Sequence, residues 1–227
     1  MITMLSLPKL NRLSPNMQST LLKIIEEAGE LARAVLTFLP YEHLGKKEIL
    51  TEPLIKGYLD AVSSELLDVA QTCVTMIFVL EEECNVKTER YIDNHLKKLS
   101  NKGYNFNKTL NYNIYTENNF KYLALPKLLL PKVTLLTTVC KIQEEVGELT
   151  QYLGKKAGAS GESEKLDFST ILDGSVQELL DVAQCCFTML YILADRYDVD
   201  TIELVEDHVN KLKRKATAYN LNKANRS

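Results

Sequence analysis

Apolar positions follow a helical period along most of the chain, and one apolar stretch occurs twice. Residues 65–80 and 178–193 are identical at eleven of sixteen positions, and most of the remaining differences exchange one apolar residue for another. A recurrence of this kind indicates an internal repeat. Because no stretch alternates convincingly like a strand, the pattern predicts an all-α fold.

The repeat extends well upstream of this stretch. The tetrapeptide Leu-Pro-Lys-Leu occurs at 7–10 and again at 125–128, each copy beginning 19 residues ahead of an acidic group. Residues 105–124 are rich in Asn and Tyr and lack a periodic apolar pattern. We therefore expect a first repeat over 1–104, a linker over 105–124 and a second repeat over 125–227.

Each repeat is expected to contain three helices. The first helix should begin at Ser14-Pro15 and end near Leu39, and its copy should begin near Pro131 and end at Gly154. The second helices should end near Cys84 and Tyr197, and the third should cover 88–102 and 201–218. The segments 40–57 and 154–165 differ in length and composition, as expected of surface loops.

Composition narrows the class of protein. Apolar residues make up 45% of the chain and charged residues 25%, and the net charge of −3 gives no electrostatic footprint for nucleic acid or a membrane. Five cysteines without C-x-x-C spacing favour a reducing, cytoplasmic compartment. The first fifteen residues lack a signal-peptide core. The apolar run from Val69 to Leu80 is too short to span a bilayer and predicts a buried helix.

Candidate chemistry lies in two acidic motifs that each occur twice. Glu27 and Glu30 are three residues apart on one helix, as are Glu65 and Asp68 on the next, so each pair shares a helix face. Antiparallel packing would bring the four carboxylates together. Such a density of oxygen ligands suits Mg²⁺ or Mn²⁺. The second copy supplies a second candidate metal site of four residues: Glu145, Glu148, Glu178 and Asp181.

The two aspartates are the most informative of these residues. Asp68 and Asp181 each lie between Leu-Leu and Val-Ala, in one of the most apolar segments of the chain. A solvated helix face explains a single acidic motif well enough. It explains less well a second motif set in an apolar helix, and the recurrence of both.

The motif Glu-Glu-x-x-Glu followed by Glu-x-x-Asp resembles the signature of the MazG-like nucleotide pyrophosphohydrolases, members of the all-α NTP pyrophosphatase superfamily. The resemblance implies an enzyme that hydrolyses a nucleoside triphosphate to the monophosphate and pyrophosphate, with Mg²⁺ held by the four carboxylates. It also implies a house-cleaning role in the nucleotide pool. Glu26 and Glu144, the leading residues of the motifs, would bind a further ion or orient the attacking water.

The helix that follows the second motif matches the family only loosely. His95 and His208 each lie 27 residues after the preceding aspartate. Each could contact substrate or simply pack between helices. Lysines near the motifs are candidate phosphate contacts, although each could equally be a solvated surface residue: Lys23, Lys97, Lys98, Lys141 and Lys211.

The resemblance also implies an assembly. Family members usually pair single-repeat subunits around a four-helix bundle, so two fused repeats would form an intrachain pseudo-dimer. The linker is long enough for the second half to fold back on the first. Whether whole chains pair as a homodimer stays open.

Three other classes of protein are alternatives. A di-iron carboxylate protein needs Glu-x-x-His pairs, but Ile92 and Val205 occupy the positions three residues before the histidines. A non-catalytic module that binds nucleotide or protein stays open, because intact ligands do not prove turnover. A purely structural helical repeat predicts no dependence on Mg²⁺.

Overall fold

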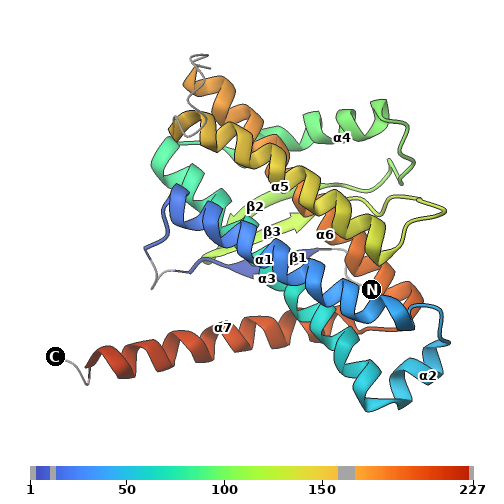
Figure 1. Ribbon diagram of the computed structural model, residues 1–227. Coiled ribbons are helices and arrows are strands. Elements are labelled where there is room, and N and C mark those ends of the chain that lie inside the picture. Colours follow the sequence, from blue (N-terminus) through green and yellow to red (C-terminus); the bar gives the residue numbers. More distant parts are fainter. Residues whose placement is uncertain (1–3, 11–13, 158–166, 225–227) are drawn as a thin grey trace.

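The computed structural model describes the chain except for residues 1–3, 11–13, 158–166 and 225–227, and it describes no side chains at 155–157 and 216–224. The fold is mostly helical (Figure 1). Its helices and strands, in chain order, are β1 Leu5–Pro8, α1 Met17–Phe38, α2 Lys46–Thr51, α3 Pro53–Cys84, α4 Ile92–Asn101, β2 Asn113–Glu117, β3 Phe120–Ala124, α5 Leu135–Ala157, α6 Phe168–Tyr197 and α7 Thr201–Ala224. Short 3₁₀ turns precede α2 and α4, at Leu39–Tyr41 and Thr88–Tyr91.

Four long helices build the core. Helix α1 packs on α3 and on α5, and α6 packs on α5 and on α3. A single cluster of buried apolar side chains joins all four, because α3 and α6 are buried on almost every face. In Figure 1, α1 and α5 lie side by side in front, and α7 runs out from the other helices.

By length and hydropathy alone, α3 and α6 could each cross a membrane. In the fold, however, 78% and 89% of their most apolar windows are buried. Core helices of soluble proteins meet the same criterion, so these two helices are weak indicators of a membrane span. The expectation that the run within α3 is too short to span did not allow for the full helix.

Helix boundaries follow the capping chemistry. Asn16 caps α1 by accepting from the Ser19 amide at 2.9 Å, while the Asn16 amide donates to Ser19 Oγ at 3.1 Å. The predicted Ser14-Pro15 start is therefore two residues early. The predicted ends at Cys84 and Tyr197 are confirmed. There Asn85 and Asp198 take left-handed conformations with φ of 54° and 61°.

Two predicted loops were partly wrong. The segment 40–57 contains α2 and the start of α3, because Glu48 accepts from the Gly45 amide at 2.8 Å and Pro53 begins a helix rather than breaking one. Gly154 does not end α5, which continues to Ala157. Most of the other predicted loop, 158–165, lies outside the described residues.

A small antiparallel sheet of order β1-β3-β2 corrects the purely helical prediction. It lies behind α1 in Figure 1, and β2 and β3 fall within the predicted linker. The turn between them is Asn118-Asn119, with φ of 49° and 64°. Two left-handed residues in succession are what a tight hairpin needs.

One buried charge hides the strand pattern. Lys121 takes an inward position of β3, where it is 2% exposed and donates to both oxygens of Glu81 at 2.7 Å. Its ammonium also lies 4.9 Å from the centre of the Phe78 ring. Because Phe120 and Tyr122 on the outward side of the strand are aromatic, the buried lysine reverses the usual order of apolar and polar positions.

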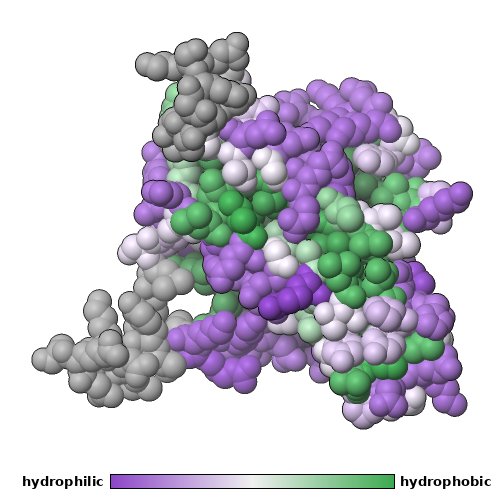
Figure 2. Space-filling view, viewed as in Figure 1, coloured by the Kyte–Doolittle hydropathy of each residue, from purple (hydrophilic) through white to green (hydrophobic). Residues whose placement is uncertain are grey.

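Figure 2 shows hydrophobic surface on the face that carries α1 and α5. On α1, Leu22, Ile25 and Leu36 are 62%, 42% and 57% exposed. They share one stripe of the helix, opposite the residues that face the core.

Candidate metal and nucleotide site

The first acidic group forms where α1 and α3 pack together. Glu27, Glu30 and Glu65 each place one carboxylate oxygen within 4.8 Å of the others. Glu27 is buried and the other two are half-buried. Burial raises the pKa of both Glu27 and Glu65, and neighbouring carboxylates add to this effect. Asp68, the fourth predicted ligand, lies outside the group.

The second acidic group forms between α5 and α6 and is more enclosed. Glu145, Glu178 and Asp181 meet the same distance limit and are 2%, 6% and 6% exposed. Here Glu148 is the predicted ligand that lies outside the group. Each group contains the second Glu of its Glu-Glu-x-x-Glu motif and the Glu of its Glu-x-x-Asp motif. The third member is Glu30 in the first group and Asp181 in the second.

Glu178 carries an unsatisfied oxygen. Its Oε2 atom is buried and has no hydrogen-bond partner. Burial, together with Glu145 and Asp181, raises the pKa of Glu178 to about 8, although Lys98 opposes the rise. A buried carboxylate oxygen without a partner costs free energy unless it is protonated or binds a cation.

The two aspartates are held by helices from the other half of the chain. Asp181 accepts from His95 Nδ1 at 3.2 Å and pairs with Lys98, both on α4. Asp68 pairs with Lys211 of α7 at 2.7 Å. Burial alone would raise the pKa of Asp181, but the bonds from His95 and Lys98 outweigh it and lower that pKa.

Each third helix therefore covers the acidic group of the opposite half. The sequence showed that His95 and His208 lie at equal distances from the preceding aspartates. It did not show that each third helix crosses to the aspartate of the other half. Spacing along the chain fixes which residues are equivalent, whereas the crossing depends on how the halves pack. Such a crossed arrangement builds each site from three helices, two from one half and one from the other.

The first site is more loosely closed than the second. His208 Nδ1 lies 3.8 Å from Asp68, compared with 3.2 Å for His95 and Asp181. In the second site, His95 Nε2 also lies 3.5 Å from Gln184 Oε1. In the first, His208 Nε2 is buried without a partner, and burial lowers the pKa of His208 to about 4.

Two further lysines lie on the same helices as the first motifs. Lys23 pairs with Glu27 at 2.6 Å and Glu26 at 3.1 Å. Lys141 repeats this with Glu145 at 2.5 Å and Glu144 at 2.9 Å. Glu26 and Glu144 are exposed, with more than half of each side chain accessible.

Lys97 is the predicted phosphate contact that the structure leaves apart. It is exposed on α4, and among the described residues no ion pair joins it to either acidic group. Its neighbour Lys98 instead faces the second site.

Glutamines that sequence reasoning overlooked anchor the upstream tetrapeptide. Gln71 Nε2 donates to the carbonyl of Pro8 at 2.9 Å, and Gln184 Nε2 donates to that of Pro126 at 2.9 Å. Both partners lie in repeated segments, so the joint recurrence was a usable signal. These bonds fix the two copies of the tetrapeptide to α3 and α6.

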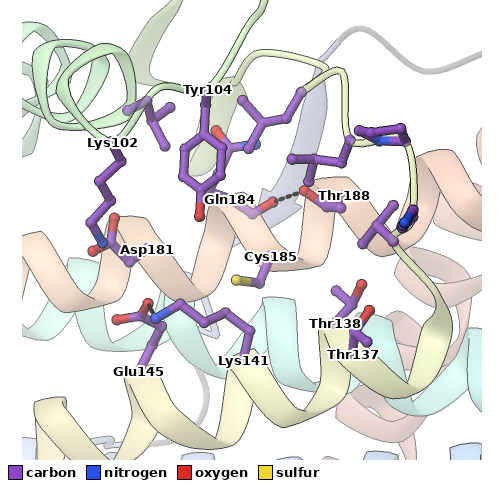
Figure 3. A pocket seen from close by; sticks show the side chains of 16 residues that line it. Lys102, Tyr104, Thr137, Thr138, Lys141, Glu145, Asp181, Gln184, Cys185 and Thr188 are labelled. Atoms are coloured by element: carbon purple, nitrogen blue, oxygen red, sulfur yellow. Dashed lines mark hydrogen bonds and ion pairs between the residues drawn. The ribbon is translucent and has the colours of Figure 1, made fainter.

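A cavity of about 470 Å³ opens beside the second group (Figure 3). Glu145 and Asp181 form part of its wall, with Lys141 next to Glu145 and the Tyr104 ring pointing into the space. The rest of the wall is mainly apolar, with cations at Lys102 and Lys132. Its remaining residues are Leu99, Leu128, Leu130, Pro131, Val133, Thr137, Thr138, Gln184, Cys185 and Thr188.

The residues present fit a hard divalent cation. Each group offers carboxylate oxygens only, at distances that one ion could bridge, and the buried Glu178 Oε2 has no hydrogen-bond partner among the described residues. Oxygen-only donor sets of this kind suit Mg²⁺ or Mn²⁺. Beside the second group, the cavity has the size and apolar lining of a small-molecule site.

Comparison with known proteins yields no relative. No protein-family model, no curated protein and no solved structure matches this chain.

Proposed function

We propose that this protein is a Mg²⁺-dependent nucleoside triphosphate pyrophosphohydrolase, built from two MazG-like repeats that fold as an intrachain pseudo-dimer. The observation that carries the proposal is the second acidic group, whose three buried carboxylates adjoin a mostly apolar cavity with lysines along its wall. A nucleoside triphosphate needs this combination, namely cations for the phosphates and apolar walls for the base.

Equivalent contacts in the two halves support the pseudo-dimer. The Gln71 and Gln184 bonds, and the lysine pairs of Asp68 and Asp181, recur at matching positions. Strands β1 and β3 also pair antiparallel with Leu5 opposite Leu123, and these two residues are equivalent in the repeat. A two-fold relation between the halves accounts for such pairing of equivalent residues.

Residues of this chain would bind the cation and the nucleotide separately. Glu145, Glu178 and Asp181 would hold the ion, and Glu27, Glu30 and Glu65 would do so in the first half. Bound Mg²⁺ neutralises triphosphate oxygens and lowers the pKa of a coordinated water. Lys141 would stand next to the phosphates, and the cavity would hold the nucleoside and exclude water from it. A role in removing unwanted nucleotides from the pool is part of the proposal.

Product analysis tests the function. The purified protein is incubated with a panel of ribo- and deoxyribonucleoside triphosphates, with Mg²⁺ or with EDTA, and nucleotides and phosphates are separated by chromatography. We expect monophosphate and pyrophosphate in the Mg²⁺ samples only, and loss of at least 100-fold in rate for Asp181→Asn. Release of the nucleoside diphosphate together with inorganic phosphate would contradict the assigned reaction.

A module that binds nucleotide without turnover is the alternative outcome. It predicts no product in any sample, together with a rise in melting temperature when nucleotide and Mg²⁺ are added. A chain that shows neither product nor stabilisation would contradict both.

A further inference from the structure

The two acidic groups have different surroundings, although their helices match. An offset of 113 residues relates Asp68 to Asp181, and the same offset relates the other equivalent residues of α3 and α6 near them. Cys185, in the cavity wall, therefore corresponds to Thr72. A position that carries a thiol beside the second group carries a hydroxyl beside the first.

The chain turns directly after α4 but continues as a helix at the equivalent position of α7. Gly103 follows α4 in a left-handed conformation with φ of 81°, which ends the helix and places Tyr104 in the cavity wall. The equivalent of Gly103 is Ala216, and α7 continues past it to Ala224. The chain therefore turns toward the second group after α4, whereas α7 runs straight on at the same position (Figure 1).

The cavities of the two halves differ as well. A smaller cavity of about 220 Å³ lies on the first half, and its wall includes Thr75, the counterpart of Thr188. Among its described wall residues, which leave out 11–13, none is a carboxylate of the first group, and the wall contains the ion pair of Lys9 with Glu82. The larger cavity reaches carboxylates of the second group.

The acidic groups also differ in enclosure. All three members of the second group are buried, whereas two of the three in the first are half-buried. The second group also holds the unpartnered, buried Glu178 Oε2. An ion and a triphosphate interact more strongly in such an enclosed site, because less water screens them.

We propose that each chain binds one nucleoside triphosphate and not two, at the second acidic group, with base and sugar in the 470 Å³ cavity. The first group keeps its carboxylates for a cation but takes no nucleoside. First-half residues complete the nucleotide site, since Leu99, Lys102 and Tyr104 form one of its walls. This inference rests on the proposed function and names the half that performs it.

Binding of non-hydrolysable nucleotide tests the inference without turnover. The probes are the α,β-imido analogues of the common ribo- and deoxyribonucleoside triphosphates, titrated with Mg²⁺ into the full chain by isothermal calorimetry. We expect one analogue bound per chain. Two per chain would overturn the inference and leave the proposed function standing, and no binding by any analogue would overturn both.

A matched pair of variants locates the site. Cys185→Phe fills the cavity, and Thr72→Phe places the same ring at the equivalent position of the first half. We expect Cys185→Phe to raise the Kd at least tenfold and Thr72→Phe to change it less than twofold. Equal effects of the two variants, or a larger effect of Thr72→Phe, would contradict the assignment.

A second pair serves if a phenylalanine variant does not fold, as judged by its thermal melt. Lys102 lies in the cavity wall, and its equivalent in the second half is Lys215; both are exposed, so reversing either charge spares the core. We expect Lys102→Glu to raise the Kd at least tenfold and Lys215→Glu to change it less than twofold. Unchanged binding in Lys102→Glu would overturn the inference.

Discussion

Lys98 of α4 pairs with Asp181 of α6, a residue of the other half of the chain and a candidate cation ligand. The lysine is therefore the built-in counter-ion of that carboxylate when no metal is bound. A divalent cation that binds Asp181 competes with the ammonium for the same oxygen. Lysine and metal should thus oppose each other in the free protein.

Lys98→Met tests this competition. Loss of the ammonium makes the second group more negative, so Mn²⁺ should bind the nucleotide-free protein several-fold more tightly. In EDTA the variant should lose about 1 to 3 kcal/mol of unfolding free energy, because within the described part of the chain Asp181 keeps only His95 as a side-chain partner. Mn²⁺ titration by electron paramagnetic resonance and urea unfolding give the two values.

Lys97→Met is the matched control, since Lys97 is the exposed neighbour. It should change neither Mn²⁺ affinity nor stability by a measurable amount. Weaker Mn²⁺ binding in Lys98→Met would show that the lysine supports the ion instead of replacing it.

Glu178 should make the metal-free protein lose stability as pH rises. Its pKa is about 8 in the fold and 4.5 in an unconstrained side chain, so the folded state favours the protonated form. That contribution is fully present below pH 4.5 and is lost as pH rises through 8. Unfolding free energy measured in EDTA between pH 5 and 9 should fall more steeply in the wild type than in Glu178→Gln, and parallel curves would contradict the assignment.

The Tyr152 ring leaves no room for a larger side chain at Gly174. A Cβ atom at this position would lie 2.3 Å from the Tyr152 ring, so Gly174→Ala should destabilise the protein by about 1 to 3 kcal/mol. Gly57→Ala is the control, because its Cβ would meet nothing within 4 Å and alanine favours a helix by about 0.5 to 1 kcal/mol. Thermal melts separate the two, and Tyr152→Ala should relieve the first effect.

The buried pair of Lys121 and Glu81 ties the sheet to α3. Lys121→Met leaves the Glu81 carboxylate without its ammonium, and we expect a loss of about 2 to 4 kcal/mol in urea unfolding. The double variant Lys121→Met, Glu81→Leu removes both charges and should recover most of the loss. Equal stability of the single and double variants would show that the loss does not come from the unpaired Glu81 carboxylate.

Local features were the easier part to predict from sequence. The helix ends at Cys84 and Tyr197 follow from residues in the next turn, and the acidic motifs follow from spacing. The hairpin at Asn118-Asn119 carried a readable turn signal, but the strand after it has a charge, Lys121, on its buried side and aromatic residues on its outward side. A buried charge is satisfied by tertiary contacts, which a local pattern does not contain.

In the candidate site as well, local spacing was predictable from the sequence and tertiary contacts were not. The motifs placed Glu27 and Glu30 on one helix face, and the structure brings them to Glu65, but Asp68 stays with Lys211. Pairing alone does not decide which carboxylates share a group, since Asp181 pairs with Lys98 of α4 and still belongs to the second group. Both lysines come from the opposite half, and no spacing rule indicates them.

The crossing of α4 and α7 has a consequence for how such a chain can evolve. In a dimer of identical subunits, every substitution enters both sites at once. Here Asp181 pairs with Lys98 of α4 and Asp68 pairs with Lys211 of α7, so a change in one of these lysines acts on one aspartate. In the proposed pseudo-dimer, each site can therefore change without the other, and the difference between Gly103 and Ala216 is of the kind that this independence permits.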